Sequence, residues 1–179
     1  MDSMSGSGPL VLIAEDDAMT RRLMERTLEK WGYQPMAVED GQRAWEALEK
    51  LPVHIVLTDW DMPRLNGVQL CRRIRSQRRD RYTYILMLTH HEDRERLVEA
   101  LEAGADDFVA KPFHPLELQA RLKAGSRIVN LERQLRRSQR RLEAMNVKLA
   151  QQATTDALMG VGNRRAFDDA LRGLHEGSA

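Results

Sequence analysis

The chain has 179 residues, of which 42% are hydrophobic and 31% are charged. This length allows one domain with an appendage, and the composition is typical of a globular protein rather than of a disordered chain. The formal net charge of +1 gives no bulk attraction to nucleic acid or to a membrane surface, so neither is predicted as a partner.

The single cysteine and the first residues bear on the location of the protein. Cys71 cannot form an internal disulfide and suits a reducing cytoplasm, where we expect the protein. No apolar stretch approaches the roughly 20 residues of a membrane span. Residues 1–8 lack the basic and hydrophobic segments of a signal peptide and are predicted to be a disordered leader.

Short apolar runs and helical patterns alternate along the chain. Residues 10–14 form a continuous apolar run, typical of a strand buried on both faces, and a helical pattern follows that ends near Gly32. Further strands are predicted at 34–40, 53–59, 84–89 and 106–112, and helices at 41–51, 68–77 and 93–104. The alternation predicts an α/β fold with a doubly wound, five-stranded parallel sheet.

Polar side chains follow the predicted strands at one edge of the sheet. Asp16 and Asp17 follow the first strand, and later strands are followed by Asp59, Thr89 and Lys111. Because parallel strands place their carboxyl ends at the same edge, these side chains should converge. Three neighbouring carboxylates suit a hard divalent cation, and Mg²⁺ is the expected cofactor. Taken singly, Asp16 or Asp17 could instead cap the following helix, and Asp59 could start a turn.

Residues 9–125 resemble a response-regulator receiver domain. The resemblance rests on Asp16-Asp17, on TDWDMPRLNG at 58–67, on Thr89 after ILML, and on GADDFVAKPF at 104–113. It implies a flavodoxin-like fold and phosphorylation of Asp59 by a sensor histidine kinase or a phosphotransfer protein.

The resemblance also implies how the metal is held. Asp16, Asp17, Asp59 and the backbone carbonyl of Asp61 would bind Mg²⁺. A carboxylate can attack phosphorus when its negative charge is offset, and phosphoryl transfer depends mostly on positioning and charge neutralisation. Crowded carboxylates are therefore tolerable when a metal is expected between them.

Other residues take roles from the same resemblance. Thr89 and Lys111 would bind the phosphoryl oxygens, and the peptide bond before Pro112 would be cis. In the resting state Lys111 is also expected to form a plain salt bridge with Asp59, which does not compete with this role. Phe108 matches an aromatic position that changes rotamer on phosphorylation, although an ordinary half-buried ring remains open. The family also uses the positions of Asp61 and His91 to tune the lifetime of the acyl phosphate.

A long helical pattern runs from about His114, contains no proline after Pro115, and carries a heptad seam from 126 to 153. Apolar residues recur there at alternating steps of three and four, which predicts a parallel coiled coil between two chains. The apolar seam residues are Ile128, Leu131, Leu135, Leu142, Met145 and Leu149. We expect a homodimer through this seam and through a face of the receiver.

Two details of this helix qualify the prediction. An earlier apolar set, at Leu118, Leu122, Gly125 and Val129, keeps a different phase, so the register slips near Gly125. Such a slip would let two packings of the seam compete. The arginine run at 136–141 could contact nucleic acid, but a solvated flank of a coiled coil is favoured.

Residues 154–179 are predicted to be the N-terminal fragment of a GGDEF domain, the catalytic domain of diguanylate cyclases. The stretch TTDALMGVGNRRAFDDAL at 154–171 resembles its opening, in which a turn and a first helix follow the coiled coil. Met159 and Gly162 depart from the usual residues, and a chance helix cap at Asp156 is the alternative.

Three classes of function remain open at this point. No GGDEF or GGEEF string occurs in the sequence, so this chain is not expected to make cyclic di-GMP itself. The favoured interpretation is a phosphorylation-controlled dimerisation module of a diguanylate cyclase. A stand-alone receiver adaptor acting by protein contact is the alternative. A DNA-binding regulator is third, because no helix-turn-helix pattern is found.

Overall fold

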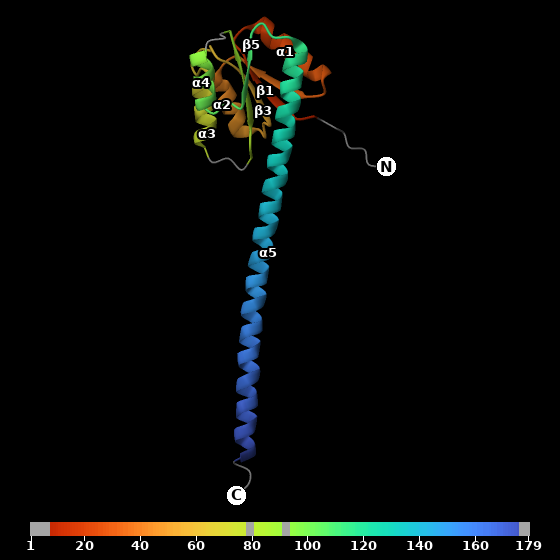
Figure 1. Cartoon of the computed structure of the whole chain (residues 1–179), viewed down its shortest axis with the longest axis vertical. Helices are drawn as coiled ribbons and strands as arrows, with labels where there is room; N and C mark the ends of the chain where they lie inside the picture. The colour runs from red at the N-terminus through yellow and green to blue at the C-terminus, as the bar shows by residue number, and fades with distance from the viewer. Residues whose placement is uncertain (1–7, 78–80, 91–93, 176–179) are drawn as a thin grey trace, which may run out of the picture. The chain divides into compact units, whose positions relative to one another are not determined.

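The computed structural model describes residues 8–77, 81–90 and 94–175, and gives side-chain positions for these except 94–95 and 150–175. The chain divides into two units after Arg133. In the first unit, a five-stranded parallel sheet in the order β2-β1-β3-β4-β5 is covered by helices on both faces (Figure 1). This confirms the predicted fold class. Most of the predicted leader, residues 1–7, lies outside the described residues.

The elements lie close to the predicted positions and differ from them by a few residues at their ends. The strands are β1 (Leu10–Ala14), β2 (Gln34–Val38), β3 (Ile55–Asp59), β4 (Tyr84–Thr89) and β5 (Asp107–Ala110). The helices are α1 (Ala18–Lys30), α2 (Gly41–Lys50), α3 (Gly67–Ser76), α4 (Arg94–Glu102) and α5 (Pro115–His175). Within the described residues, no helix combines the length and the apolar character that crossing a membrane requires.

Two clusters of buried hydrophobic residues make up the core, one on each face of the sheet. Helices α2, α3 and α4 cover one face, with Trp45 and Leu70 among their buried side chains. Helix α1 and the first part of α5 cover the other face, through residues such as Leu28 and Leu122. Strands β3 and β4 are buried along their whole length, which explains why they read as continuous apolar runs.

Helix α5 packs against the sheet at the position of the predicted register slip. Leu118, Leu122 and Val129 are buried there, and a Cβ added at Gly125 would lie only 2.5 Å from Cδ1 of the Tyr84 ring. The earlier apolar phase therefore belongs to the core of a single chain. The expectation that two phases compete for one dimer seam is wrong, because the first phase is already buried against the sheet.

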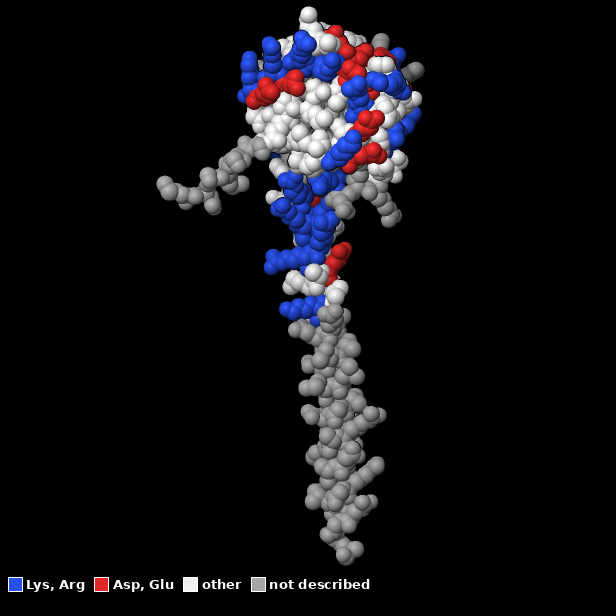
Figure 2. Space-filling model, turned by 180° about the vertical axis from the view of Figure 1, so that it is seen from behind, with Lys and Arg blue, Asp and Glu red and all other residues white. Residues whose placement is uncertain are grey.

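The later phase of α5 is exposed in the single chain. The six apolar seam residues have exposed fractions between 39% and 64%, and they are Ile128, Leu131, Leu135, Leu142, Met145 and Leu149. Lys and Arg dominate the visible surface of the described part of this helix (Figure 2). The backbone remains helical through residues 154–171, so the structure shows no turn there, and the side chains of that stretch lie outside the described residues.

Candidate functional site

Three carboxylates meet where β1 and β3 end. Ligand oxygens of Glu15, Asp16 and Asp59 all lie within 4.8 Å of one another. The register of the sheet explains the meeting, because Ala14 pairs with Thr58 and the next residues along the two parallel strands are Glu15 and Asp59. Glu15 and Asp59 are almost fully buried, whereas Asp16 is exposed.

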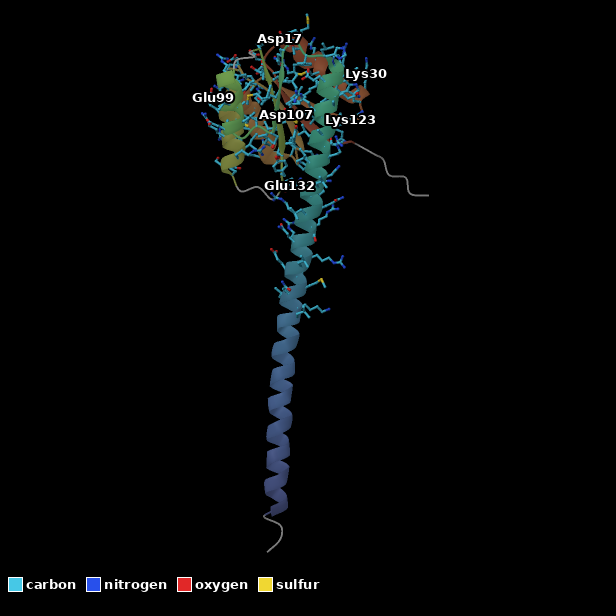
Figure 3. The ribbon with its side chains drawn as sticks, viewed as in Figure 1. Asp17, Lys30, Glu99, Asp107, Lys123 and Glu132 are labelled. Carbon is cyan, nitrogen blue, oxygen red and sulfur yellow. The ribbon has the colours of Figure 1, made fainter. Side chains whose placement is uncertain are left out.

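Asp17 lies outside this cluster. It is the N-cap residue of α1, and its Oδ1 accepts a 2.7 Å hydrogen bond from the Thr20 amide. Hydrogen bonds from Thr20 lower the pKa of the exposed Asp17 carboxyl, as expected for an anion at a helix N-terminus. Figure 3 shows Asp17 at the end of the first unit opposite Glu132. The structure thus brings together Asp16 and Asp59 from the predicted ligands, and adds Glu15 where the sequence suggested Asp17.

Lys111 holds the two buried carboxylates together. Its Nζ lies 2.7 Å from Glu15 Oε2 and 2.8 Å from Asp59 Oδ2. Burial works to lower the pKa of Lys111, but hydrogen bonds to Asp59 and Glu15 outweigh it and raise that pKa. Burial raises the pKa of Glu15, although Lys111 opposes the change. When all four groups are ionised, three carboxylates face one ammonium group, and the excess negative charge suits a divalent cation with oxygen ligands.

The last residue of β4 and the first residue after β5 lie beside Asp59. Leu88 pairs with Asp59 across the sheet, so Thr89 follows one position further on, and it is buried. The backbone carbonyl of Thr89 accepts a 2.6 Å hydrogen bond from the Lys111 amide. The peptide bond between Lys111 and Pro112 is cis.

The loop after β3 returns closely past Asp59. The amide of Trp60 donates a 2.8 Å hydrogen bond to Asp59 Oδ1. A Cβ at Gly67 would lie 2.2 Å from the Asp59 carbonyl oxygen, so only glycine allows α3 to start here. Asp61 is exposed, and its carboxylate forms a loose ion pair of 3.7 Å with Arg96 of α4.

Two further predicted residues are placed differently. Phe108 is half-buried against the core, and the guanidinium carbon of Arg121 lies 5.8 Å from its ring centroid. This environment fits an ordinary packed ring, and the rotamer change remains a prediction. His91 lies outside the described residues.

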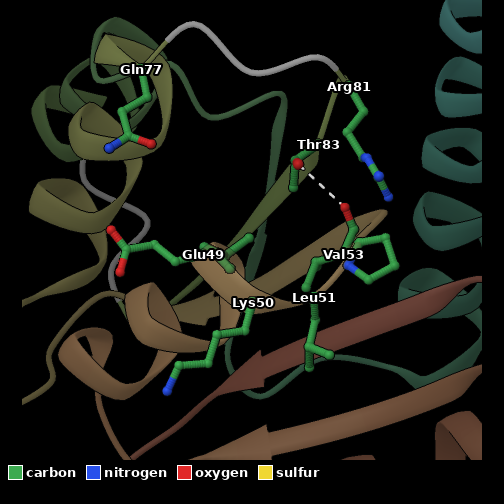
Figure 4. Close-up of a pocket in the computed structure, with 9 residues that line it drawn as sticks. Glu49, Lys50, Leu51, Val53, Gln77, Arg81 and Thr83 are labelled. Carbon is green, nitrogen blue, oxygen red and sulfur yellow. Dashed lines mark hydrogen bonds between the residues drawn. The ribbon is translucent and has the colours of Figure 1, made fainter.

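A separate hollow lies away from the carboxylates, near the start of β3 and β4. It has a volume of about 490 Å³, and its lining includes Lys50, Gln77 and Arg81 (Figure 4). The Thr83 hydroxyl donates a 3.3 Å hydrogen bond to the Val53 carbonyl at its wall. Because functional groups of open parallel sheets gather at the carboxyl ends of the strands, the cluster around Asp59 is the stronger candidate site.

A model of the response regulator receiver domain matches residues 11–123. The chain belongs to the response regulator receiver family. Receiver domains bind Mg²⁺ at an acidic site, and the cluster of Glu15, Asp16 and Asp59 has the chemistry for one.

Known relatives agree with this assignment. The phosphate regulon transcriptional regulatory protein PhoB of Pseudomonas aeruginosa is 38% identical over 120 residues, which cover 65% of this chain and 51% of PhoB. The receiver domain of the sensor histidine kinase PA1611 of P. aeruginosa, solved with a magnesium ion coordinated in its active-site cleft, is 32% identical with a TM-score of 0.62. The match covers 66% of this chain and 98% of that one.

A third relative is described as a probable two-component system response regulator/GGDEF domain protein. Its structure aligns with a TM-score of 0.65 and 27% identity over 69% of this chain and 51% of that chain. The chain thus spans about half the length of PhoB and of this GGDEF protein.

Proposed function

We propose that this two-component receiver domain is switched by phosphorylation of Asp59. The observation that supports the proposal is the contact of Lys111 with Asp59 and Glu15. The Lys111 ammonium group lies 2.8 Å from the Asp59 carboxylate, and the acidic side chains of Glu15 and Asp16 lie beside it. A buried carboxylate with this environment is suited to attack phosphorus once its charge is offset.

In the proposed reaction, an oxygen of Asp59 attacks the phosphorus of a phosphohistidine on a sensor kinase or phosphotransfer protein. The P–O bond of an acyl phosphate forms, the P–N bond breaks, and the imidazole leaves and takes up a proton. Lys111 and the Thr89 hydroxyl bind the phosphoryl oxygens. Mg²⁺, held by Glu15, Asp16, Asp59 and the backbone carbonyl of Asp61, would supply positive charge to the same oxygens.

Phosphorylation by a small donor tests this proposal directly. Acetyl phosphate with Mg²⁺ should increase the mass of the chain by one phosphoryl group, located at Asp59 by peptide mapping. Asp59→Asn should abolish the change. Asp61→Asn is the matched control, since it also replaces an acid of this loop but leaves the acceptor, and it should still be phosphorylated. A mass change that persists in the Asp59→Asn variant would show that the acceptor is another residue.

We further propose that the phosphorylated form acts through a parallel homodimer. The support is the exposed apolar seam of α5, which can bury its face against a second copy of the same helix. With Ile128 at a and Leu131 at d, Arg127 takes a g position and Glu132 an e position. In a parallel pair, Arg127 of one chain would face Glu132 of the other, an attractive combination.

We propose diguanylate cyclase control as the output of this dimer. It is supported by the resemblance of residues 154–171 to the opening of GGDEF domains and by structural relatives described as response regulator/GGDEF proteins. The sequence that follows Ala179 in the gene tests it. A GGDEF or GGEEF motif within the domain that residues 154–179 would begin would support cyclase control. The absence of such a motif would favour a receiver adaptor.

A further inference from the structure

Arg21 of α1 reaches back to the loop that carries two of the clustered acids. Its Nη1 donates hydrogen bonds to the backbone carbonyl of Glu15 at 2.6 Å and to that of Asp16 at 3.0 Å. These two carbonyl groups flank Cα of Asp16 on either side. A single guanidinium therefore fixes both peptide planes on which the direction of the Asp16 side chain depends.

The loop needs such a restraint because its side chains repel one another. Carboxylate oxygens of Glu15, Asp16 and Asp59 lie within 4.8 Å of one another. Like charges at this separation favour any movement of the loop that carries Glu15 and Asp16 away from Asp59. On its other side, the loop is held by the Glu15 amide, which donates to the Val38 carbonyl of β2 at 3.1 Å. Arg21 supplies the matching restraint from α1, so the acids face Asp59 before any cation arrives.

We infer that Arg21 is a positioning residue for the cation site: it holds Glu15 and Asp16 in place through their backbone carbonyls and touches neither the cation nor the phosphoryl group. This inference rests on the proposed Mg²⁺-dependent phosphorylation of Asp59. It extends the set of residues that determine cation affinity to a basic side chain on α1, outside the acidic cluster.

The positioning effect of Arg21 and its positive charge should change the Mg²⁺ affinity in opposite directions. The positive charge of Arg21 repels a cation bound nearby, so a role through charge alone predicts that its removal tightens Mg²⁺ binding. A positioning role predicts that its removal weakens binding, because the acids are no longer held together. The sign of the change therefore distinguishes the two.

Mg²⁺ titrations of the whole chain test the inference, followed by tryptophan fluorescence because the Trp60 amide is bonded to Asp59. Arg21→Gln should weaken the Mg²⁺ affinity about tenfold, the lower end of what residues supporting metal ligands contribute. Arg22→Gln is the matched control, because it removes the same charge from the next position, which lines a surface groove on α1. Its affinity should stay within about twofold of the wild type or become slightly tighter.

A second pair of variants tests the inference if Arg21→Gln does not fold. Arg21→Lys keeps the charge, but its ammonium nitrogen is one atom closer to the backbone than Nη1, so it should reach the two carbonyl groups less well and bind Mg²⁺ more weakly than Arg22→Lys. All titrations are made at a temperature where circular dichroism shows fully folded protein. Faster hydrogen exchange of the amides of residues 15–17 in Arg21→Lys would support the restraint directly.

The outcomes separate this inference from the proposed function. Equal or tighter Mg²⁺ binding by Arg21→Gln than by Arg22→Gln, with the wild type still phosphorylated at Asp59, would overturn the positioning role and leave the proposed function intact. A wild type that neither binds Mg²⁺ nor accepts a phosphoryl group at Asp59 would overturn both.

Discussion

The ammonium group of Lys111 donates a 2.7 Å hydrogen bond to the carboxylate of Glu15, across 96 positions of the sequence. Both groups are buried, so the pair is shielded from solvent and its geometry is restrained. The contact identifies Glu15, rather than Asp17, as the acid that shares the site with Asp59. It also fixes where the first substitutions should be made.

We predict that Glu15→Gln weakens Mg²⁺ binding about tenfold, because the site loses one anionic oxygen ligand. The amide still accepts a hydrogen bond from Lys111, so the fold should be retained. Asp17→Asn is the matched control, since its amide oxygen can still cap α1 and its charge lies outside the cluster. Titration with Mg²⁺ checks both. A larger loss for Asp17→Asn than for Glu15→Gln would restore Asp17 as the ligand.

The fold was predictable from the sequence because its strands are buried on both faces. Strands β1, β3 and β4 therefore appear as uninterrupted apolar runs whose ends fall within a few residues of the observed ones. The predicted convergence of Asp16, Asp59 and Lys111 followed from strand polarity. Glu15 was missed because its place depends on the register of β1 against β3, with Ala14 opposite Thr58, which no local pattern reveals.

The contacts of α5 with the sheet also could not be predicted from a local sequence pattern. The sequence revealed a change of apolar phase near Gly125, but its cause is the close approach of the helix to Tyr84. The compact first unit accordingly extends to Arg133. Val129 is buried against the sheet, and Arg133 contacts His54. Such long-range contacts depend on the packed fold rather than on local preference.

We predict that Gly125→Ala destabilises the receiver domain by about 1–3 kcal/mol, because the added methyl group must displace the Tyr84 ring. The expected sign is opposite to helix propensity, which favours alanine by about 1 kcal/mol inside a helix. Urea unfolding measures the effect. In a Tyr84→Val background the same substitution should cost much less, since the ring is gone. An equal cost in both backgrounds would contradict the steric explanation.

We predict that the stability of the receiver domain depends on pH because of His54. Its Nδ1 accepts a 3.1 Å hydrogen bond from the Leu10 amide, and its Nε2 lies 2.5 Å from Nη2 of Arg133. Burial, together with the charges of Arg133 and Arg81, lowers the pKa of His54 below its ordinary value of 6.5. The unfolded chain therefore takes up a proton more readily than the folded one. The stabilisation is complete above the ordinary value and is lost as the pH falls below it toward the lowered pKa.

Urea unfolding at about pH 7.5 and pH 5.5 checks this dependence. His54→Asn is the comparison variant, because its amide oxygen can still accept from the Leu10 amide but does not titrate. The wild type should lose more stability between the two pH values than the variant does. Carboxylates titrate in both proteins, so the difference between their losses belongs to His54. Equal losses would rule out the histidine as the source.

The exposed seam of α5 predicts association of two chains. Leu135 and Leu142 both take a positions, where a parallel partner would bury them, yet they are exposed in the single chain. Replacing both with aspartate would place unpaired charges in the seam, at a cost on the order of several kcal/mol each. The double variant should therefore remain monomeric at concentrations where the wild type dimerises, with beryllofluoride and Mg²⁺ present as a phosphoryl mimic.

Light scattering over a range of concentrations measures this association. The control carries two aspartates at outer c positions, Arg137→Asp with Ala144→Asp, and should dimerise like the wild type because these positions face away from the partner. The receiver core should be unaffected in both variants, since all four positions lie beyond Arg133, where the first unit ends. If the seam variant and the wild type give the same mass at every concentration, α5 does not form the interface. Any dimer would then have to be held by a face of the receiver domain.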